Sequence, residues 1–402
     1  MKLKTLDRRL VTILLIVFVQ MVGAGMILPI LPLYAKNEFS MSPTTVTMLI
    51  AAFFAAQFVG GPVLGQWSDK VGRVPVLVVS QIGTVIAFIG FGIATVPWML
   101  FAARLFDGLT GGNLVVAQAY VTDVTPREHR ARALGLIFAM FGLGFFIGPA
   151  IGGMLATFGA RVPYFFAAFV AAIVVLLTVF TLHESMTAEE RQAIRDKAVK
   201  MSLRSVLAIR PLRWTVALAF LAQFALGLVI ATFALFGEAV LFETNAELGV
   251  GLLLALVGLF QVVTQVGILP GGLSLFGERK LIAIGIGFRS AGLVIFAFTV
   301  SPWLAAVGGI LFATGGGLSM PPTQSVATKT VDDSRRGGVL GVIQASMSLA
   351  FITSMAIGGA LFTIAPHLPN QVALGASLLA LLPALALQRS LRLHLDPVLG
   401  EA

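Results

Sequence analysis

Long apolar stretches follow one another along almost the whole chain. A helix needs roughly 20 consecutive apolar residues to cross the hydrocarbon core of a bilayer. We therefore predict twelve spanning helices, at residues 10–34, 44–66, 74–94, 98–122, 133–157, 163–182, 214–236, 248–270, 281–300, 302–328, 338–363 and 371–388. Only 11% of the residues are charged, against about 25% in soluble proteins, which excludes a water-soluble fold. The expected fold class is an all-α integral membrane protein.

The distribution of lysine and arginine predicts the orientation of these helices. With twelve spans, both termini and every even-numbered connection lie on one side of the membrane, and that side holds 23 of the 27 basic residues. The positive-inside rule makes it the cytoplasmic side of the cell (inner) membrane. The net charge of +9 therefore reflects topology and gives no support to nucleic-acid binding. The first stretch follows basic residues but is too long for a signal peptide and lacks a cleavage site, so we expect a retained helix.

The chain contains two copies of one unit. A shift of 206 residues aligns several pairs without a gap: Gly111 with Gly317, Gln118 with Gln324, Arg130 with Arg336, Leu134-Gly135 with Leu340-Gly341, and Gly152-Gly153 with Gly358-Gly359. Such a parallel repeat predicts two six-helix bundles related by a pseudo-two-fold axis. We expect the bundles at 1–182 and 214–402, joined by a cytoplasmic linker, 183–213, with an amphipathic helix around Glu189 to Met201.

The fourth predicted span carries charge at membrane depth. Arg104, Gly111 and Gln118 recur every seven residues, with Asp107 on the same stripe. A charge at the bilayer centre costs about 2.5 to 3.5 kcal/mol even on the mildest scale, so Arg104 and Asp107 should face the protein interior or water. Burial favours the protonated form of Asp107 and Arg104 favours the ionised form, which suits a proton-coupling site. A permanent ion pair that locks the helix is the alternative.

Two further segments have distinctive patterns. In the fifth span, Gly144, Gly148 and Gly152 recur every four residues, with Pro149 and Gly153 beside them. This stripe predicts close approach of another helix and a kink, with packing alone as the alternative.

The connection between the second and third spans reads Gly65-Gln-Trp-Ser-Asp69-Lys70-Val-Gly72-Arg73, whereas the corresponding turn at 271–280 lacks the aspartate. Its glycines suit a tight reversal. Asp69 could face the helix end around Gly338, and Arg73 could pair with Asp123. We expect these bonds to act as a cytoplasmic gate that forms when the two halves close. A charge cluster that only anchors the turn at the headgroups is the alternative.

Amides and one further arginine suggest a substrate cavity. Those we expect to line it are Gln20, Asn113, Gln118, Gln223, Gln261, Arg289 and Gln324. Few charges and many aromatic side chains suit an uncharged or cationic lipophilic molecule better than a polyanion. Arg289 could instead pair with Asp107 or only with backbone carbonyls.

These motifs resemble those of the major facilitator superfamily, and within it the twelve-span tetracycline and multidrug proton antiporters. The resemblance extends over essentially the whole chain and rests on three motifs: the 2–3 connection, Arg104 to Asn113 in span 4, and Gly144 to Gly153 in span 5. It implies alternating access by rocking of the two halves, the 2–3 motif as the gate, the span 4 arginine in proton coupling, and efflux driven by inward proton flow. It implies small-molecule substrates and protons as partners, no cofactor and a monomer.

The chain departs from the family pattern at one position, and three other functions are alternatives to drug export. Tetracycline exporters have an acidic residue before the Met-x-Gly-x-Gly run of span 1, where this chain has Gln20, which argues against tetracycline as the substrate and suggests that the proton site has moved to Asp107. A proton-coupled or facilitative uptake carrier on the same fold is the first alternative. A receptor would leave the repeat unexplained. An enzyme is disfavoured because no histidine lies in a span, no metal-binding cluster is visible and the chain has no cysteine.

Overall fold

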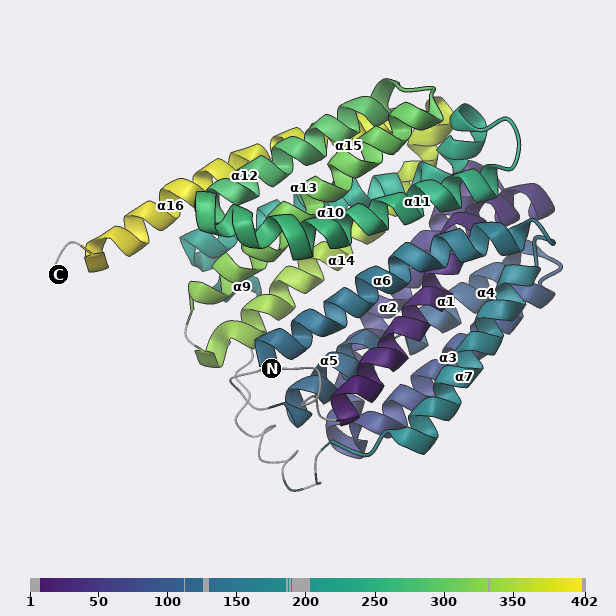
Figure 1. The fold of residues 1–402 in the computed structure, drawn as a ribbon, viewed down its shortest axis with the longest axis horizontal. Helices are drawn as coiled ribbons and strands as arrows, with labels where there is room; N and C mark the ends of the chain where they lie inside the picture. Colours follow the sequence, from purple (N-terminus) through teal and green to yellow (C-terminus); the bar gives the residue numbers. More distant parts are fainter. Residues whose placement is uncertain are drawn as a thin grey trace. The chain divides into compact units, whose positions relative to one another are not determined.

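The computed structural model describes residues 8–111, 113–125, 130–185, 187, 189, 203–331 and 333–399, and these ranges contain helices and no strands (Figure 1). The helices are α1 Arg8–Phe39, α2 Pro43–Val71, α3 Arg73–Ile93, α4 Pro97–Thr110, α5 Asn113–Val124, α6 Arg130–Ala156, α7 Val162–Thr181, α9 Leu203–Ala208, α10 Arg210–Phe236, α11 Ala246–Val263, α12 Leu269–Phe298, α13 Pro302–Lys329, α14 Asp333–Ile364, α15 Leu368–Leu379 and α16 Leu381–Leu399. Two short π-helices, η3 Gly237–Leu241 and η4 Thr264–Ile268, extend α10 and α11. The predicted amphipathic helix in the linker lies outside the described residues.

The helices agree with twelve spans. Among the described residues, nine stretches are long and apolar enough to cross a membrane, and one of them, Ala246–Phe298, contains both the eighth and the ninth predicted span. The fourth and fifth predicted spans are present as α4 with α5 and as α6. The predicted all-α membrane fold is therefore confirmed.

Contacts divide the chain into two compact units. The first contains residues 1–197 and 242–258, and the second contains 198–241 and 259–402. In the first unit α1 packs against α6 and α7, α2 against α4, and α3 against α4 and α7. In the second unit α10 packs against α14 and α15, and α12 against α13 and α15. The expected division at 182 and 214 stays a prediction, because the first part of α11 groups with the first unit.

Each unit contains a sharp reversal at a glycine, and the first unit has a further glycine with positive φ, Gly159 at 138°, between α6 and α7. Gly72, between α2 and α3, has φ 114° and ψ 160°, and Gly277, inside α12, has φ 70° and ψ 165°. Residues other than glycine rarely adopt such a positive φ, because their Cβ atom clashes with the backbone. The predicted turn 65–73 is therefore too long: Gly65, Asp69 and Lys70 belong to the last turns of α2, and only Gly72 reverses the chain.

The fourth span was expected as one helix, and this expectation is wrong. It consists of α4 and α5, because α4 ends at Thr110 and Gly111 has φ −73° and ψ 32°. Glycine weakens a helix by roughly 1 kcal/mol relative to alanine, and two glycines follow Thr110 in the sequence. The stripe of Arg104, Gly111 and Gln118 is thus interrupted at its middle member.

Candidate functional site

Arg104 and Asp107 of α4 form a buried ion pair inside the first unit. The Arg104 Nη1 atom lies 3.4 Å from Asp107 Oδ2, and the two side chains are 12% and 9% exposed. The Arg104 guanidinium also lies over the Phe53 ring, 4.5 Å from its centroid. Both charges face the interior of the helix bundle, as the cost of burying them in lipid predicts.

Several polar atoms in this unit are buried without a hydrogen-bond partner. They are Nε of Arg104, the hydroxyl of Tyr164 and both amide atoms of Gln81. Buried polar groups normally have partners, so these atoms keep unused hydrogen-bonding capacity. The ion pair therefore includes a free N–H donor, Arg104 Nε.

The break between α4 and α5 is stabilised by side chains from two neighbouring helices. Gln57 of α2 donates its Nε2 hydrogen to the Gly111 carbonyl at 2.9 Å, and the Ser80 hydroxyl of α3 donates to the Thr110 carbonyl. A helix end leaves carbonyls without intrahelical partners, which is costly inside a membrane. These two donors therefore hold the helix break in place, three to four residues after Asp107.

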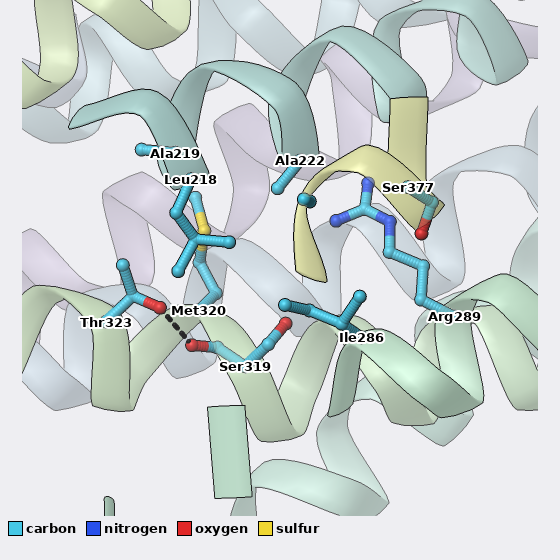
Figure 2. A pocket seen from close by; sticks show the side chains of 10 residues that line it. Leu218, Ala219, Ala222, Ile286, Arg289, Ser319, Met320, Thr323 and Ser377 are labelled. Atoms are coloured by element: carbon cyan, nitrogen blue, oxygen red, sulfur yellow. Dashed lines mark hydrogen bonds between the residues drawn. The ribbon is translucent and has the colours of Figure 1, made fainter. Parts of the chain in front are cut away.

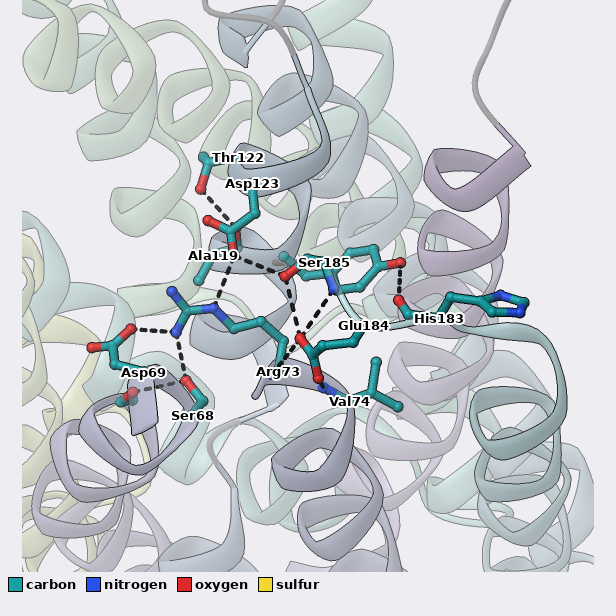
Figure 3. A network of polar contacts seen from close by, with 12 residues as sticks. Ser68, Asp69, Arg73, Val74, Ala119, Thr122, Asp123, His183, Glu184 and Ser185 are labelled. Atoms are coloured by element: carbon teal, nitrogen blue, oxygen red, sulfur yellow. Dashed lines mark hydrogen bonds and ion pairs between the residues drawn. The ribbon is translucent and has the colours of Figure 1, made fainter. Parts of the chain in front are cut away.

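Arg73 is the centre of a polar network at the start of α3 (Figure 3). Its Nε lies 3.0 Å from Asp123 Oδ2, and its Nη1 lies 2.7 Å from Ser68 Oγ and 2.5 Å from Asp69 Oδ1. The predicted Arg73–Asp123 pair is therefore present. Both residues lie in the first unit. That this bond forms only when the two halves close stays a prediction. The approach of Asp69 to the region of Gly338 and the gate role of this segment stay predictions.

Glu184, after α7, extends this network in a way the sequence analysis missed. Its carboxylate accepts hydrogen bonds from the backbone N–H groups of Arg73 at 2.9 Å and Val74 at 3.2 Å. A carboxylate at a helix N-terminus satisfies free N–H groups and complements the helix dipole. The Ser185 hydroxyl donates to Asp123 at 3.0 Å, so the same segment holds both Arg73 and its partner.

The glycine stripe of α6 lies against the backbone of α1. A Cβ atom on Gly148 would lie 2.6 Å from the Val22 carbonyl oxygen and 2.8 Å from the Gly25 Cα, and Gly144 and Gly152 have similarly close neighbours in α1. On another side of α6, Gly153 faces the backbone of α11 near Leu248. Close helix approach is thus as expected. α6 continues through Pro149.

The residues expected to line a substrate cavity are distributed over both units. Gln20 and Gln118 are half-buried in the first unit; Gln223 and Arg289 are buried and Gln261 and Gln324 half-buried in the second. The side chain of Asn113 lies outside the described residues. Arg289 lines a small cavity within the second unit, and none of these amides is among the other residues that line it. A shared substrate cavity stays a prediction.

Some site residues could have been found from the sequence and others could not. Gln81 is an amide inside an apolar span, the same signal that selected the other glutamines. Ser80, Tyr164 and Glu184 carry no such signal, because one hydroxyl or one acid beside a span is common in membrane helices. The role of Gln57 depends on where α4 ends, which the apolar pattern does not reveal.

Comparisons with known proteins support the predicted fold. The family described as Major Facilitator Superfamily matches residues 13–273 and 243–397. The class C tetracycline resistance protein of Escherichia coli is 33% identical over 94% of this chain and 96% of its own. Multidrug resistance protein 2 of Bacillus subtilis is 27% identical over 88% of each chain. The solved structure of the nucleoside transporter NupG has a TM-score of 0.72 at 14% identity and covers 96% of this chain and 100% of its own.

Proposed function

Because the chain belongs to the Major Facilitator Superfamily, and within it to the group of tetracycline and multidrug resistance proteins, we propose that it exports a small lipophilic or cationic compound in exchange for protons. The similarity to resistance proteins over nearly the full length of both chains carries this proposal. The few charges and several amides within the spans favour an uncharged or cationic cargo.

Asp107 is the proposed proton carrier. When ionised it pairs with Arg104, and when protonated it releases the guanidinium, so one proton changes the charge of a buried site by one unit. The single 3.4 Å contact between them and the unpartnered Arg104 Nε support an exchangeable pair rather than a fixed fork of two hydrogen bonds. Asp107 is buried inside the helix bundle, so a proton reaches it through the protein interior and not from the lipid.

The direction of transport is tested in two steps. Expression in a host without efflux pumps, followed by a panel of toxic compounds that includes tetracycline, identifies the compounds to which the protein confers resistance. Inverted membrane vesicles are then energised so that their interior is acidic. We expect them to accumulate the identified compound, and collapse of the proton gradient to release it. Accumulation only in right-side-out vesicles would instead support the uptake carrier.

The orientation and the oligomeric state belong to the same proposal: both termini are cytoplasmic and one chain is sufficient for transport. The natural chain has no cysteine, so a single cysteine can be placed near either end without a background signal. A membrane-impermeant thiol reagent should label both positions only in inverted vesicles. Labelling from outside intact cells would contradict the predicted topology.

A further inference from the structure

Arg289 of α12 is a buried cation without a counter-charge. The residue is 5% exposed, and its Nε and Nη2 atoms have no hydrogen-bond partner. In the part of the chain that the structure describes, no carboxylate lies within ion-pairing distance of it. Its Cζ lies 4.7 Å from the centroid of the Phe312 ring, which stabilises the charge only in part. A buried charge normally requires a partner of opposite charge, and Arg289 has none among the described residues.

The guanidinium projects into a small cavity within the second unit (Figure 2). Its volume of about 10 Å³ is near the lower limit for one ordered water molecule. The cavity lies between α10, α12, α13 and α15, and its polar lining besides Arg289 consists of the hydroxyls of Ser319, Thr323 and Ser377. The remaining lining is apolar. A drug-sized cargo does not fit this space.

The hydroxyls can supply further donors. Ser377 Oγ lies 2.8 Å from Ser290 Oγ, so one of these two hydroxyls donates to the other and the acceptor keeps its own hydrogen. Ser319 and Thr323 donate to carbonyls four residues earlier in α13. Those carbonyls also accept the helical backbone N–H, so the two hydroxyls can rotate toward the cavity without leaving them unsatisfied. The cavity thus combines one fixed positive charge with lining hydroxyls that can turn to donate to a bound group.

We propose that this cavity binds one small monovalent anion, of the size of chloride, as the counter-charge of Arg289. A water molecule would satisfy some of the N–H groups but would leave the positive charge uncompensated in an apolar bundle. A chloride ion is larger than water, so the side chains that line the cavity must move apart slightly to admit it, but unlike water it cancels the charge. No lysine is among the residues that line the cavity, and the helix end that lines it, Ala380, is the C-terminal end of α15, so its affinity for anions depends on Arg289.

The test is thermal unfolding of the purified full chain in detergent, with chloride replacing gluconate at constant ionic strength. A ligand that binds only the folded state raises stability with concentration. We expect the melting temperature to rise with chloride and the Arg289→Met variant to lose at least about tenfold in apparent chloride affinity, as for the loss of a charge-assisted hydrogen bond. Arg289→Lys should retain part of the effect. Arg213→Gln removes an exposed positive charge from the same unit and should respond like the natural protein.

A second measurement covers the case in which the Arg289 variants do not fold. Crystals of the natural protein grown in bromide should show an anomalous scattering peak within hydrogen-bonding distance of Arg289. No response of the natural protein to chloride, an equal response in Arg289→Met, or an ordered water in place of bromide beside Arg289 would each overturn the proposal.

Discussion

At the scale of single residues, a buried charge is stabilised by one or two specific partners, and Arg73 is an example. Its side chain is 11% exposed, and its strongest partner, Asp123, is 9% exposed, whereas Asp69 is 43% exposed. A partner in water contributes little to stability because solvent screens the pair. A buried partner is essential once the arginine itself is buried, because its loss leaves a charge without compensation. Asp123 therefore contributes more than Asp69 to the stability of the folded protein.

Replacement of Asp123 should destabilise the protein far more than replacement of Asp69. We expect Asp123→Asn to lower the free energy of unfolding by about 3 kcal/mol, the scale for a broken buried pair. Asp69→Asn should cost about 1 kcal/mol or less. Thermal unfolding of both variants in detergent measures the difference. Equal losses would contradict the partner assignment of Arg73.

The helix break between α4 and α5 depends in the same way on a single side chain. Gln57→Leu removes the donor to the Gly111 carbonyl and leaves that group buried and unpaired, at a cost of about 1 to 3 kcal/mol. Gln57→Asn shortens the side chain, keeps an amide and serves as the control with intermediate loss. A melting temperature unchanged in Gln57→Leu would show that the break is stable without this bond.

At the scale of elements, the contact of α1 with α6 determines how closely two helices approach. Carbonyl and Cα atoms of α1 fill the space beside Gly148, and backbone atoms cannot move aside as a flexible side chain can. The same unit contains Gly61 in α2, where an added Cβ would meet nothing within 4 Å. The two positions therefore form a matched pair of glycines, one inside a close helix contact and one outside.

Gly148→Ala should separate α1 from α6 and impair both folding and transport. Overpacking of this kind costs about 1 to 3 kcal/mol. Gly61→Ala should cost much less: like Gly148, Gly61 precedes a proline, which restricts an added Cβ equally in both variants, but no neighbouring helix occupies the space beside it. Unfolding temperature and growth protection measured on both variants test this contrast. If Gly148→Ala behaves like Gly61→Ala, the close contact has no energetic role.

The apolar pattern predicted the spanning helices because roughly 20 apolar residues in sequence have no other stable environment. The four-residue spacing of the glycines located the stripe of α6. The predicted helix ends placed Arg73 and Asp123, 50 residues apart in the sequence, on the same side of the membrane. The apolar pattern missed the break at Gly111, because glycine is tolerated inside membrane helices and only the donors Gln57 and Ser80 make a break stable there. The role of Glu184 depends on where the end of α7 packs, which no local pattern encodes.

At the scale of the whole molecule, the proposed export depends on a proton that crosses the membrane in each transport cycle. The family and the resistance-protein relatives establish a membrane transporter. The buried pair of Arg104 and Asp107 gives that transporter a group whose charge changes with one proton. Exchange of substrate across the membrane needs no proton, whereas net export against a gradient does. The two reactions can therefore be separated by one substitution.

The most direct measurement is proton movement into proteoliposomes that contain a pH-sensitive dye, after addition of a compound identified by the growth screen. The natural protein should move protons in response to the compound. Asp107→Asn should abolish this movement and retain exchange of labelled for unlabelled compound, while Glu243→Gln, which removes an exposed carboxylate, should behave like the natural protein. Unchanged proton movement in Asp107→Asn would contradict the assignment of Asp107 as the proton carrier.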